Sequence, residues 1–281
     1  MKKFKPTSPG QRGRIGIDYS AILTANRPHK KLTRKIATHA GRNNRGVITT
    51  RHQGAGHKKR YREIDFRQGK LDVPGRVETI EYDPYRTAFI ALVVYRDGRR
   101  VYILAPRELK VGEEILTAEK AELKTGNRML LKNIPIGTLI HNVELRKDSG
   151  GRLARAAGTY AEILAHDAGY TDIKLSSKAV RKISSNNFAS IGQVSNHEYN
   201  LVNIGKAGRA RWLGIRPTVR GSAMNPVDHP YGGGEGRQRR GTKRPKTLWG
   251  KVTGGRKTRR PKKWSNNLIV KGRPRKRQSK K

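Results

Sequence analysis

Apolar and polar residues alternate most regularly in the middle of the chain. Residues 76–82 read Arg-Val-Glu-Thr-Ile-Glu-Tyr, the period-two pattern of a strand with one buried face, and Asp83-Pro84 ends it. Residues 88–95 are rich in β-branched and aromatic side chains, and Asp97-Gly98 turns them back into residues 100–104. The pattern therefore predicts one strand followed by a hairpin.

Shorter runs of the same kind continue to residue 194. Each is bounded by Gly, Asn or Asp, and they predict strands at 113–117, 138–145, 160–164, 172–175, 179–183 and 189–194. Residues 152–165 contain helix formers, but Gly158 and Thr159 interrupt them, so we predict a strand there as well. Helix should be scarce, and short strands at close spacing indicate small barrels.

The connection between residues 119 and 135 is the expected boundary between two barrels. Residues 61–200 are too many for one small barrel, and Lys124-Thr125-Gly126-Asn127 interrupts the apolar pattern. We therefore predict one barrel at 61–123 and a second at 124–200. Open Greek-key barrels expose a strand face and loops that are suited to RNA.

Charge is concentrated at the two ends of the chain. The 281 residues include 63 Lys and Arg against 21 Asp and Glu, a formal net charge of +42. Residues 1–60 hold 16 cations and 1 acid, residues 61–200 hold 22 and 18, and residues 201–281 hold 25 and 2. Flanks that carry like charges and are rich in Gly and Pro bury too little apolar surface to offset the conformational entropy that they would lose on becoming ordered by themselves. We therefore predict basic extensions at 1–60 and 201–281 that become ordered on a polyanion.

So strong a positive field indicates a nucleic-acid partner. Each neutralised phosphate releases counterions, so many Lys and Arg contacts add up to tight binding, whereas ordinary solvated surfaces mix both signs. The lack of cysteine excludes disulfides and Cys-based zinc sites. We see neither a signal peptide nor an apolar stretch long enough for a bilayer, and therefore expect a cytoplasmic protein with no membrane partner.

Two flanking segments carry the chemistry of an RNA contact. Residues 38–62 and 205–236 mix Gly, which lets backbone approach phosphate, with Arg, which binds phosphate bidentately, and with polar and aromatic side chains that bond or stack on bases. The basic tail should contact phosphate too. The candidate RNA contacts are Arg42, Asn43, Asn44, Arg45, Arg51, His52, His57, Lys58, Lys59, Arg60, Arg62, Lys206, Arg209, Arg211, Trp212, Arg220, Asn225, His229, Arg237, Arg239, Arg240, Arg259 and Arg260.

These segments and the middle of the chain share a set of motifs with one family. The sequence resembles the universal large-subunit ribosomal protein L2 family in its bacterial form. The resemblance covers nearly the whole chain and rests on GRNNRG, RHQGAGHKKRYR, IEYDP, YILAP, NIPIGTLIHNVEL and above all MNPVDHPYGGGEG, which occur in the order and spacing of the family.

The resemblance implies both a fold and a role. The fold is mainly β, an oligonucleotide-binding-fold barrel followed by an SH3-like barrel, with long basic extended N- and C-terminal arms. The role is that of a structural constituent of the large ribosomal subunit that binds large-subunit ribosomal RNA near the peptidyl-transferase region. Family members support assembly of that region, subunit association across the intersubunit bridge, and tRNA binding. The implied neighbours are other ribosomal proteins, the small subunit and tRNA.

The sequence departs from the family pattern at three places. Ala55 stands where the family usually has Gly, Tyr231 stands where it usually has a second His, and residues 175–181 replace the usual hairpin turn. The Tyr231 change keeps an aromatic ring that can form hydrogen bonds, but it removes the imidazole.

His229 is the family position discussed as important for peptidyl transfer. A general base needs a positioned partner, and Asp228 or Glu235 could supply one. We favour a role in ordering the loop or binding RNA phosphate, because peptide-bond formation can proceed by substrate positioning.

Other chemistry has weaker support. His52 and His57 lack acid or thiol partners at ligand spacing, so we predict no protein metal site, and the only metal that we expect is magnesium carried by the RNA. Residues 232–236 do not form a nucleotide-binding loop and no hydrolase motif occurs, so we predict neither an enzyme nor a cofactor. Two rival functions are a DNA-compacting protein and an RNA-processing enzyme. The first usually shows helices that read a DNA groove, and the second needs clustered carboxylates for metal ions.

Overall fold

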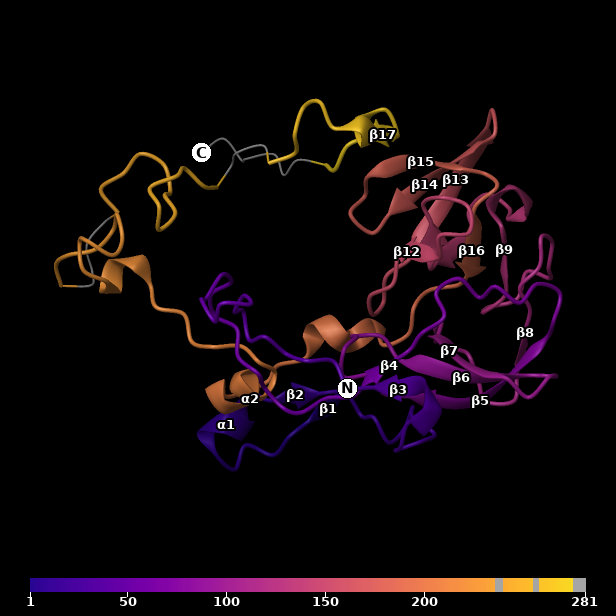
Figure 1. Cartoon of the computed structure of the whole chain (residues 1–281), viewed down its shortest axis with the longest axis horizontal. Coiled ribbons are helices and arrows are strands. Elements are labelled where there is room, and N and C mark those ends of the chain that lie inside the picture. The colour runs from indigo at the N-terminus through magenta and orange to yellow at the C-terminus, as the bar shows by residue number, and fades with distance from the viewer. Residues whose placement is uncertain (236–239, 255–257, 275–281) are drawn as a thin grey trace. The chain divides into compact units, whose positions relative to one another are not determined.

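A computed structural model describes residues 1–235, 240–254 and 258–274 (Figure 1). Two compact units make up this chain. We call the first the body; it comprises Met1–Ala37, Lys58–Lys206 and the described part of Asn267–Lys281. We call the second the basic unit; it comprises Thr38–His57 and Ala207–Asn266. The predicted divisions after residues 60, 123 and 200 stay a prediction.

A four-stranded antiparallel sheet forms the first barrel of the body, and its strands follow the order β7-β6-β5-β8. The hairpin turns at Asp97-Gly98, where Gly98 has a φ of +78°. The predicted strand, the hairpin and the strand after them are confirmed as β5 (Gly75–Glu81), β6 (Ile90–Tyr95), β7 (Arg100–Leu104) and β8 (Glu114–Ile115).

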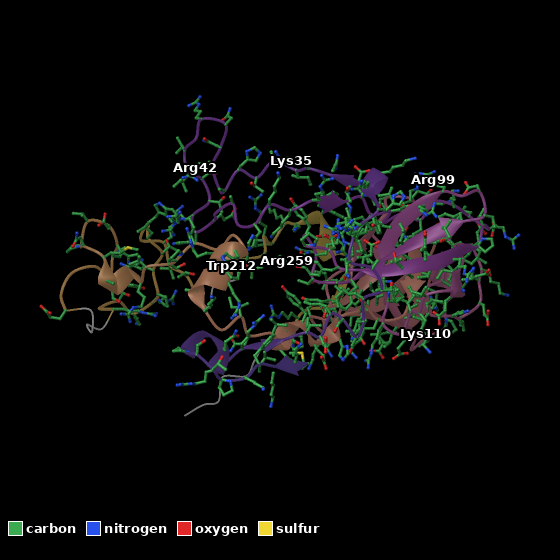
Figure 2. The ribbon with its side chains drawn as sticks, turned by 90° about the horizontal axis from the view of Figure 1, so that it is seen from below. Lys35, Arg42, Arg99, Lys110, Trp212 and Arg259 are labelled. Carbon is green, nitrogen blue, oxygen red and sulfur yellow. The ribbon has the colours of Figure 1, made fainter. Side chains whose placement is uncertain are left out.

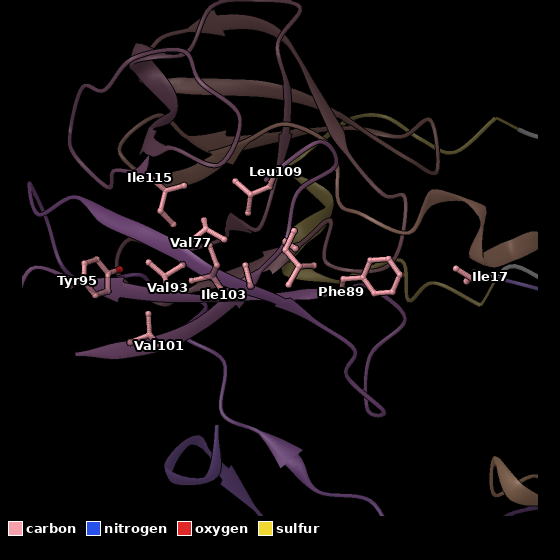
Figure 3. Packing of buried hydrophobic residues seen from close by; sticks show 12 residues of the cluster. Ile17, Val77, Phe89, Val93, Tyr95, Val101, Ile103, Leu109 and Ile115 are labelled. Carbon is pink, nitrogen blue, oxygen red and sulfur yellow. The ribbon is translucent and has the colours of Figure 1, made fainter. Parts of the chain in front are cut away.

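The core of the first barrel lies on one face of this sheet. Val77 and Val93 are opposite each other in the register, Val101 pairs with Val93 on the other side, and all three are buried. Figure 3 shows this row, with Phe89 and Ile17 at one end. Ile17 comes from the basic N-terminal flank, so a part of that flank packs into the folded body rather than lying apart from it.

A seven-stranded antiparallel sheet forms the second barrel, in the order β17-β15-β14-β13-β10-β16-β9. Its core is a separate cluster that includes Met129, Ile140, Ile163 and Ile173. The prediction of a mainly β chain with two small barrels is therefore confirmed. The strands are β9 (Arg128–Leu130), β10 (Leu139–His141), β13 (Ala161–Asp167), β14 (Tyr170–Leu175), β15 (Val180–Ser184), β16 (Phe188–Ile191) and β17 (Ile269–Lys271), with the pair β11 (Val143–Glu144) and β12 (Gly151–Leu153) beside them.

Two local predictions differ from the structure. Strand β9 lies inside the connection 119–135, which we had expected to be a linker. The prediction of strand throughout 152–165 is wrong for residues 154–160, because Ala154 and Gly158 take positive φ angles and break the run. The altered turn after Leu175 still joins β14 to β15, with the Leu175 N–H donating to the Ala179 carbonyl at 2.9 Å.

The remaining elements of the described chain are short, as expected for a protein with little helix. Two small pairs of strands come from the N-terminal flank. They are β1 (Lys2–Lys3) with β2 (Ile15–Gly16), and β3 (Thr33–Arg34) with β4 (Tyr61–Arg62). The helices are α1 (Pro9–Arg12) and α2 (Ala207–Trp212), and 3-10 turns occupy Lys30–Leu32, Leu131–Asn133, His197–Leu201, Gly221–Ala223 and Trp264–Asn266.

His141 of β10 makes the stability of the second barrel sensitive to acid. Its side chain is buried, and Nδ1 lies 3.0 Å from the Gly192 carbonyl oxygen, so Nδ1–H donates there. Burial lowers the pKa of His141 to about 4. The unfolded chain takes up a proton near pH 6.5 whereas the folded chain does not, so stability is complete above that pH and falls as the pH drops towards 4.

We therefore expect His141→Asn to remove part of the acid sensitivity. An asparagine amide can still donate to Gly192, but it does not titrate. Between pH 7 and pH 4 the unmodified chain should lose about 3 kcal/mol more of its free energy of unfolding than the variant does. Urea unfolding at both pH values measures this, and equal losses in the two proteins would contradict it.

Candidate RNA interface

Most of the two basic segments singled out in the sequence lies together in the basic unit, whereas their residues Lys58, Lys59, Arg60, Arg62 and Lys206 belong to the body. Their backbones bond directly: the Gly54 N–H donates to the Gly214 carbonyl at 2.7 Å, and the His57 N–H donates to the Trp212 carbonyl at 2.9 Å. The His57 and Trp212 rings also pack, with centroids 5.5 Å apart. Residues separated by more than 150 positions therefore form one small structure, which positions the side chains of both segments.

Close backbone approach explains the glycine at position 56. Gly56 has a φ of +63°, and a Cβ atom there would lie 2.6 Å from the Trp212 carbonyl oxygen and 2.8 Å from the Gly214 nitrogen. Both the left-handed conformation and the lack of space favour glycine. Ala55, the departure from the family pattern, lies beside it and is exposed.

A tight loop at residues 41–50 presents cations outward. The Asn43 Oδ1 atom accepts hydrogen bonds from the N–H groups of Arg45 and Val47, each at 3.0 Å, so Asn43 orders the loop as well as being a candidate contact. Arg42 forms an isolated bridge with Ile48. The side chains of Arg42 and Arg45 are exposed, and Figure 2 labels Arg42.

His229 belongs to a compact loop that is closed at its neck. The Gly233 N–H donates to the Met224 carbonyl at 3.0 Å, and the Gly232 N–H donates to the His229 carbonyl at 2.8 Å. A Cβ atom at Gly232 would lie 2.0 Å from the Asn225 carbonyl oxygen, so only glycine fits there. The tip of the loop, Val227, is almost fully exposed.

The His229 ring is held by its own loop. Nδ1 accepts the Tyr231 N–H at 3.1 Å, which places the ring proton on Nε2 in the neutral form. The ring lies over Gly221 and 4.9 Å from the Tyr231 ring. In the described chain neither Asp228 nor Glu235 forms an ion pair with His229. This geometry favours a loop-ordering role over a general base.

Tyr231 stands at the position of the usual second histidine, and its side chain forms contacts within the basic unit. Its hydroxyl oxygen accepts a hydrogen bond from the Lys246 N–H, and this bond lowers the pKa of Tyr231. The Arg240 guanidinium lies 5.7 Å from the centre of the Tyr231 ring. Tyr231 therefore connects the His229 loop to residues 240–246.

The other candidate residues are mostly exposed. Arg51 lies over the Trp249 ring at 5.2 Å, and Trp249 and Trp264 expose 70% and 67% of their surface. Arg237 and Arg239 lie outside the described residues. Exposed candidates are Asn44, Arg51, His57, Lys58, Arg60, Lys206, Arg211, Trp212, Arg220, Asn225, Arg240, Arg259 and Arg260, and His52, Lys59, Arg62, Arg209 and His229 are half-buried.

Two candidates are engaged in contacts within the protein. Arg62 donates to the Arg60 carbonyl at 2.9 Å, and its charge offsets part of the rise that burial causes in the pKa of Glu81. Arg259 donates to the side chains of Ser265 at 2.9 Å and Asn266 at 2.6 Å. These contacts compete with RNA for the two guanidinium groups.

Sequence reasoning missed a cluster of stacked cations and rings in the body. Arg86 lies 4.9 Å from the centre of the Tyr61 ring, and it donates to the Tyr61 hydroxyl at 2.7 Å. Arg155 lies 4.4 Å from the centre of the Phe66 ring. These residues line a pocket of about 480 Å³ that Tyr85 also borders. The signal in the sequence was the interleaving of Tyr and Phe with Arg at 61–86.

The electrostatics of this pocket suit an anion. Burial lowers the pKa of Arg155, and the like charges of Arg86 and Arg152 lower it further. Arg86 already forms an ion pair with the buried Asp83 carboxylate, so a phosphate here would meet mainly Arg155, and the rings offer stacking surfaces for bases.

A metal site requires several ligating side chains close together, and a membrane-spanning helix requires a long apolar run. Residues 1–235, 240–254 and 258–274 contain no group of three or more His, Cys, Asp or Glu side chains placed to hold a metal ion. Among the same residues, none of the helices combines the length and the apolar character that a membrane span requires.

Comparison with protein-family models finds two matches in tandem. Residues 29–117 match the model described as ribosomal proteins L2, RNA binding N-terminal domain. Residues 124–250 match the model described as ribosomal proteins L2, C-terminal domain. The first match contains the first barrel and the loop at 41–50, and the second contains most of the second barrel, α2 and the His229 loop.

Proposed function

Because the chain belongs to the ribosomal protein L2 family, whose members are RNA-binding structural proteins of the large ribosomal subunit, we propose that it is a primary binder of ribosomal RNA near the peptidyl-transferase region. The two barrels are then the oligonucleotide-binding-fold barrel and the SH3-like barrel of that family. The observation that carries the proposal is the basic unit, in which two distant segments pair and hold Arg42, Arg45 and Arg211 outward.

The cations and glycines of the basic unit explain how RNA would be held. An arginine guanidinium binds phosphate through two parallel hydrogen bonds. Glycine at the positions where the two segments pair lets their backbones meet without side chains between them. The stacked arginines beside Phe66 and Tyr61 supply a second contact on the body. With its RNA held in place, the protein supports peptide-bond formation by positioning, and no residue of this chain needs to transfer a proton.

The wider role follows from the same placement. A chain anchored in this RNA region would support assembly of the large subunit, tRNA binding and association with the small subunit across the intersubunit bridge. Neighbouring ribosomal proteins are its other partners, magnesium ions accompany the RNA, and the cytoplasmic ribosome is its location. The net charge of +42, concentrated in the two flanks, supports RNA as their main partner.

We predict that His229→Asn retains the tRNA binding and peptide transfer that His229→Ala weakens. An asparagine Oδ1 can accept the Tyr231 N–H in place of Nδ1, whereas alanine leaves that donor without its partner. The lost hydrogen bond is worth about 1 kcal/mol, so tRNA binding by His229→Ala particles should weaken about fivefold, together with peptide transfer.

Purified large subunits carrying either variant allow assembly, tRNA binding and peptide transfer to be measured separately. If His229→Ala particles assemble fully and bind tRNA normally but lose peptide transfer alone, and asparagine does not restore it, then His229 acts chemically and our assignment is wrong.

A further inference from the structure

The body has an apolar hollow where the N-terminal flank crosses the first barrel. Ile17 and Ile22 from the flank line it together with Phe89 and Leu109 of the barrel region. Its volume is about 190 Å³. Pockets for small molecules begin at about 300 Å³, so the hollow is suited to a single apolar side chain.

Tyrosines lie next to this hollow. The Tyr19 ring packs edge-on against Tyr82 at 5.4 Å and against Phe89 at 6.1 Å. Tyr199 directly follows Glu198, which lines the hollow, and Tyr19, Tyr82 and Tyr199 expose 38%, 43% and 39% of their surface. Partly exposed tyrosines around an apolar hollow are typical of protein interfaces, since the rings bury apolar area while the hydroxyls keep polar partners.

The charge around the hollow is unlike that of the flanks. Glu108 and Glu198 line it, and each has a cationic partner: the Arg107 guanidinium lies 3.6 Å from Glu108, and the Met1 amino group donates to Glu198 at 3.1 Å. Asp18, the one acid among residues 1–60, follows Ile17 directly. In a chain of net charge +42, the carboxylates here balance the cations beside them, so this place attracts RNA phosphate less than the flanks do.

We propose that this hollow is a docking surface for a neighbouring protein, which inserts one aliphatic or aromatic side chain flanked by Lys or Arg. The apolar side chain fills the space above Phe89, and its basic neighbours meet Glu108 and Glu198. The proposal is independent of the RNA contacts of the basic unit, because it uses a different surface and the opposite charge.

Photo-crosslinking in purified large subunits tests the proposal. The probe p-benzoyl-L-phenylalanine replaces Tyr199 in the full chain, and a second preparation carries it in place of Ile22, so that one position remains if the other prevents incorporation. We expect each probe to crosslink to a protein segment in which an apolar residue is flanked by Lys or Arg, identified by mass spectrometry.

The variant Glu108→Gly tests whether the carboxylate of Glu108 contributes to docking. Glu108 has a φ of +71°, a conformation that glycine adopts more easily, so this change removes the carboxylate without harming the fold. It should lower the yield of the crosslink about fivefold. A probe at Arg45 should crosslink to RNA in the same particles, with a yield that Glu108→Gly leaves unchanged.

The outcomes separate this proposal from the RNA-binding function. Crosslinks from Tyr199 and Ile22 to RNA, to a protein segment without cations, or to no molecule at all would overturn the docking proposal, as would a yield indifferent to Glu108→Gly. Each of these results leaves RNA binding standing as long as the probe at Arg45 reaches RNA.

Discussion

Replacing Arg128 with methionine is expected to lower the free energy of unfolding of the body by about 3–5 kcal/mol. Arg128 of β9 and Glu144 of β11 are buried inside the second barrel, with exposed fractions of 0% and 1%, and Nη2 lies 2.9 Å from Oε1. The Arg128 Nη1 atom also donates to the Asn142 carbonyl at 2.9 Å. Burial lowers the pKa of Arg128 whereas the charge of Glu144 raises it, so each charge is tolerated because of the other.

The cost of Arg128→Met comes from the Glu144 carboxylate that is left behind. Its oxygens also accept the N–H groups of Asp148 and Gly150, each at 3.1 Å, so it anchors the loop that follows β11. Changing Glu144 to Gln in addition removes the isolated charge and keeps an acceptor for the loop. The double variant should therefore recover a large part of the lost stability.

Urea unfolding with a matched surface control measures this effect. Lys174 and Glu162 form an ion pair at 2.8 Å on the exposed side of β13 and β14, and Lys174→Met should cost less than about 1 kcal/mol. If Arg128→Met costs no more than Lys174→Met, the buried pair does not stabilise the barrel in the way described.

The same residue shows why strand β9 could not be predicted. Strands with an alternating or continuous apolar pattern, such as β5 and β6, are visible in the sequence because side-chain burial repeats every two residues. Strand β9 begins with a buried arginine, and the Gly126-Asn127 pair directly before it suggests a turn. Only the pairing with Glu144, sixteen positions later, makes that burial possible.

Contacts between distant segments account for the other misses. Strand β17 joins the edge of β15 through Arg181 and Ile269, although it lies in a flank whose charge indicated an extended arm. The stacking of Arg86 on Tyr61 depends on how the chain folds back. In the candidate site, charge and glycine patterns selected Arg42 and Arg45, which the structure shows to be exposed, and their contact with RNA stays a prediction.

The central claim is that the basic unit holds RNA through its exposed cations. The affinity of the full chain for large-subunit ribosomal RNA should therefore fall by about 10³ to 10⁵-fold between 50 and 200 mM salt, as expected for roughly six to ten phosphate contacts. Each contact removed should reduce the slope of log affinity against log salt by about 0.7–0.9.

Two variants of equal net charge allow the salt titration to distinguish RNA contacts of the basic unit from contacts of the body. The first changes four exposed cations of the basic unit to Gln, and the second changes four exposed cations of the body outside the stacked cluster. Because the charge lost is the same, the long-range field falls equally in both. The substituted residues are Arg42, Arg45, Arg51 and Arg211 in the first, and Arg96, Lys120, Lys124 and Lys178 in the second.

The slope of log affinity against log salt for these two variants is the most direct measurement of the claim. We predict that the slope falls by about 3 when the basic unit is changed and stays at its original value when the body is changed. Equal slopes in the two variants, or a larger loss from the body variant, would show that RNA is held elsewhere and would contradict the account.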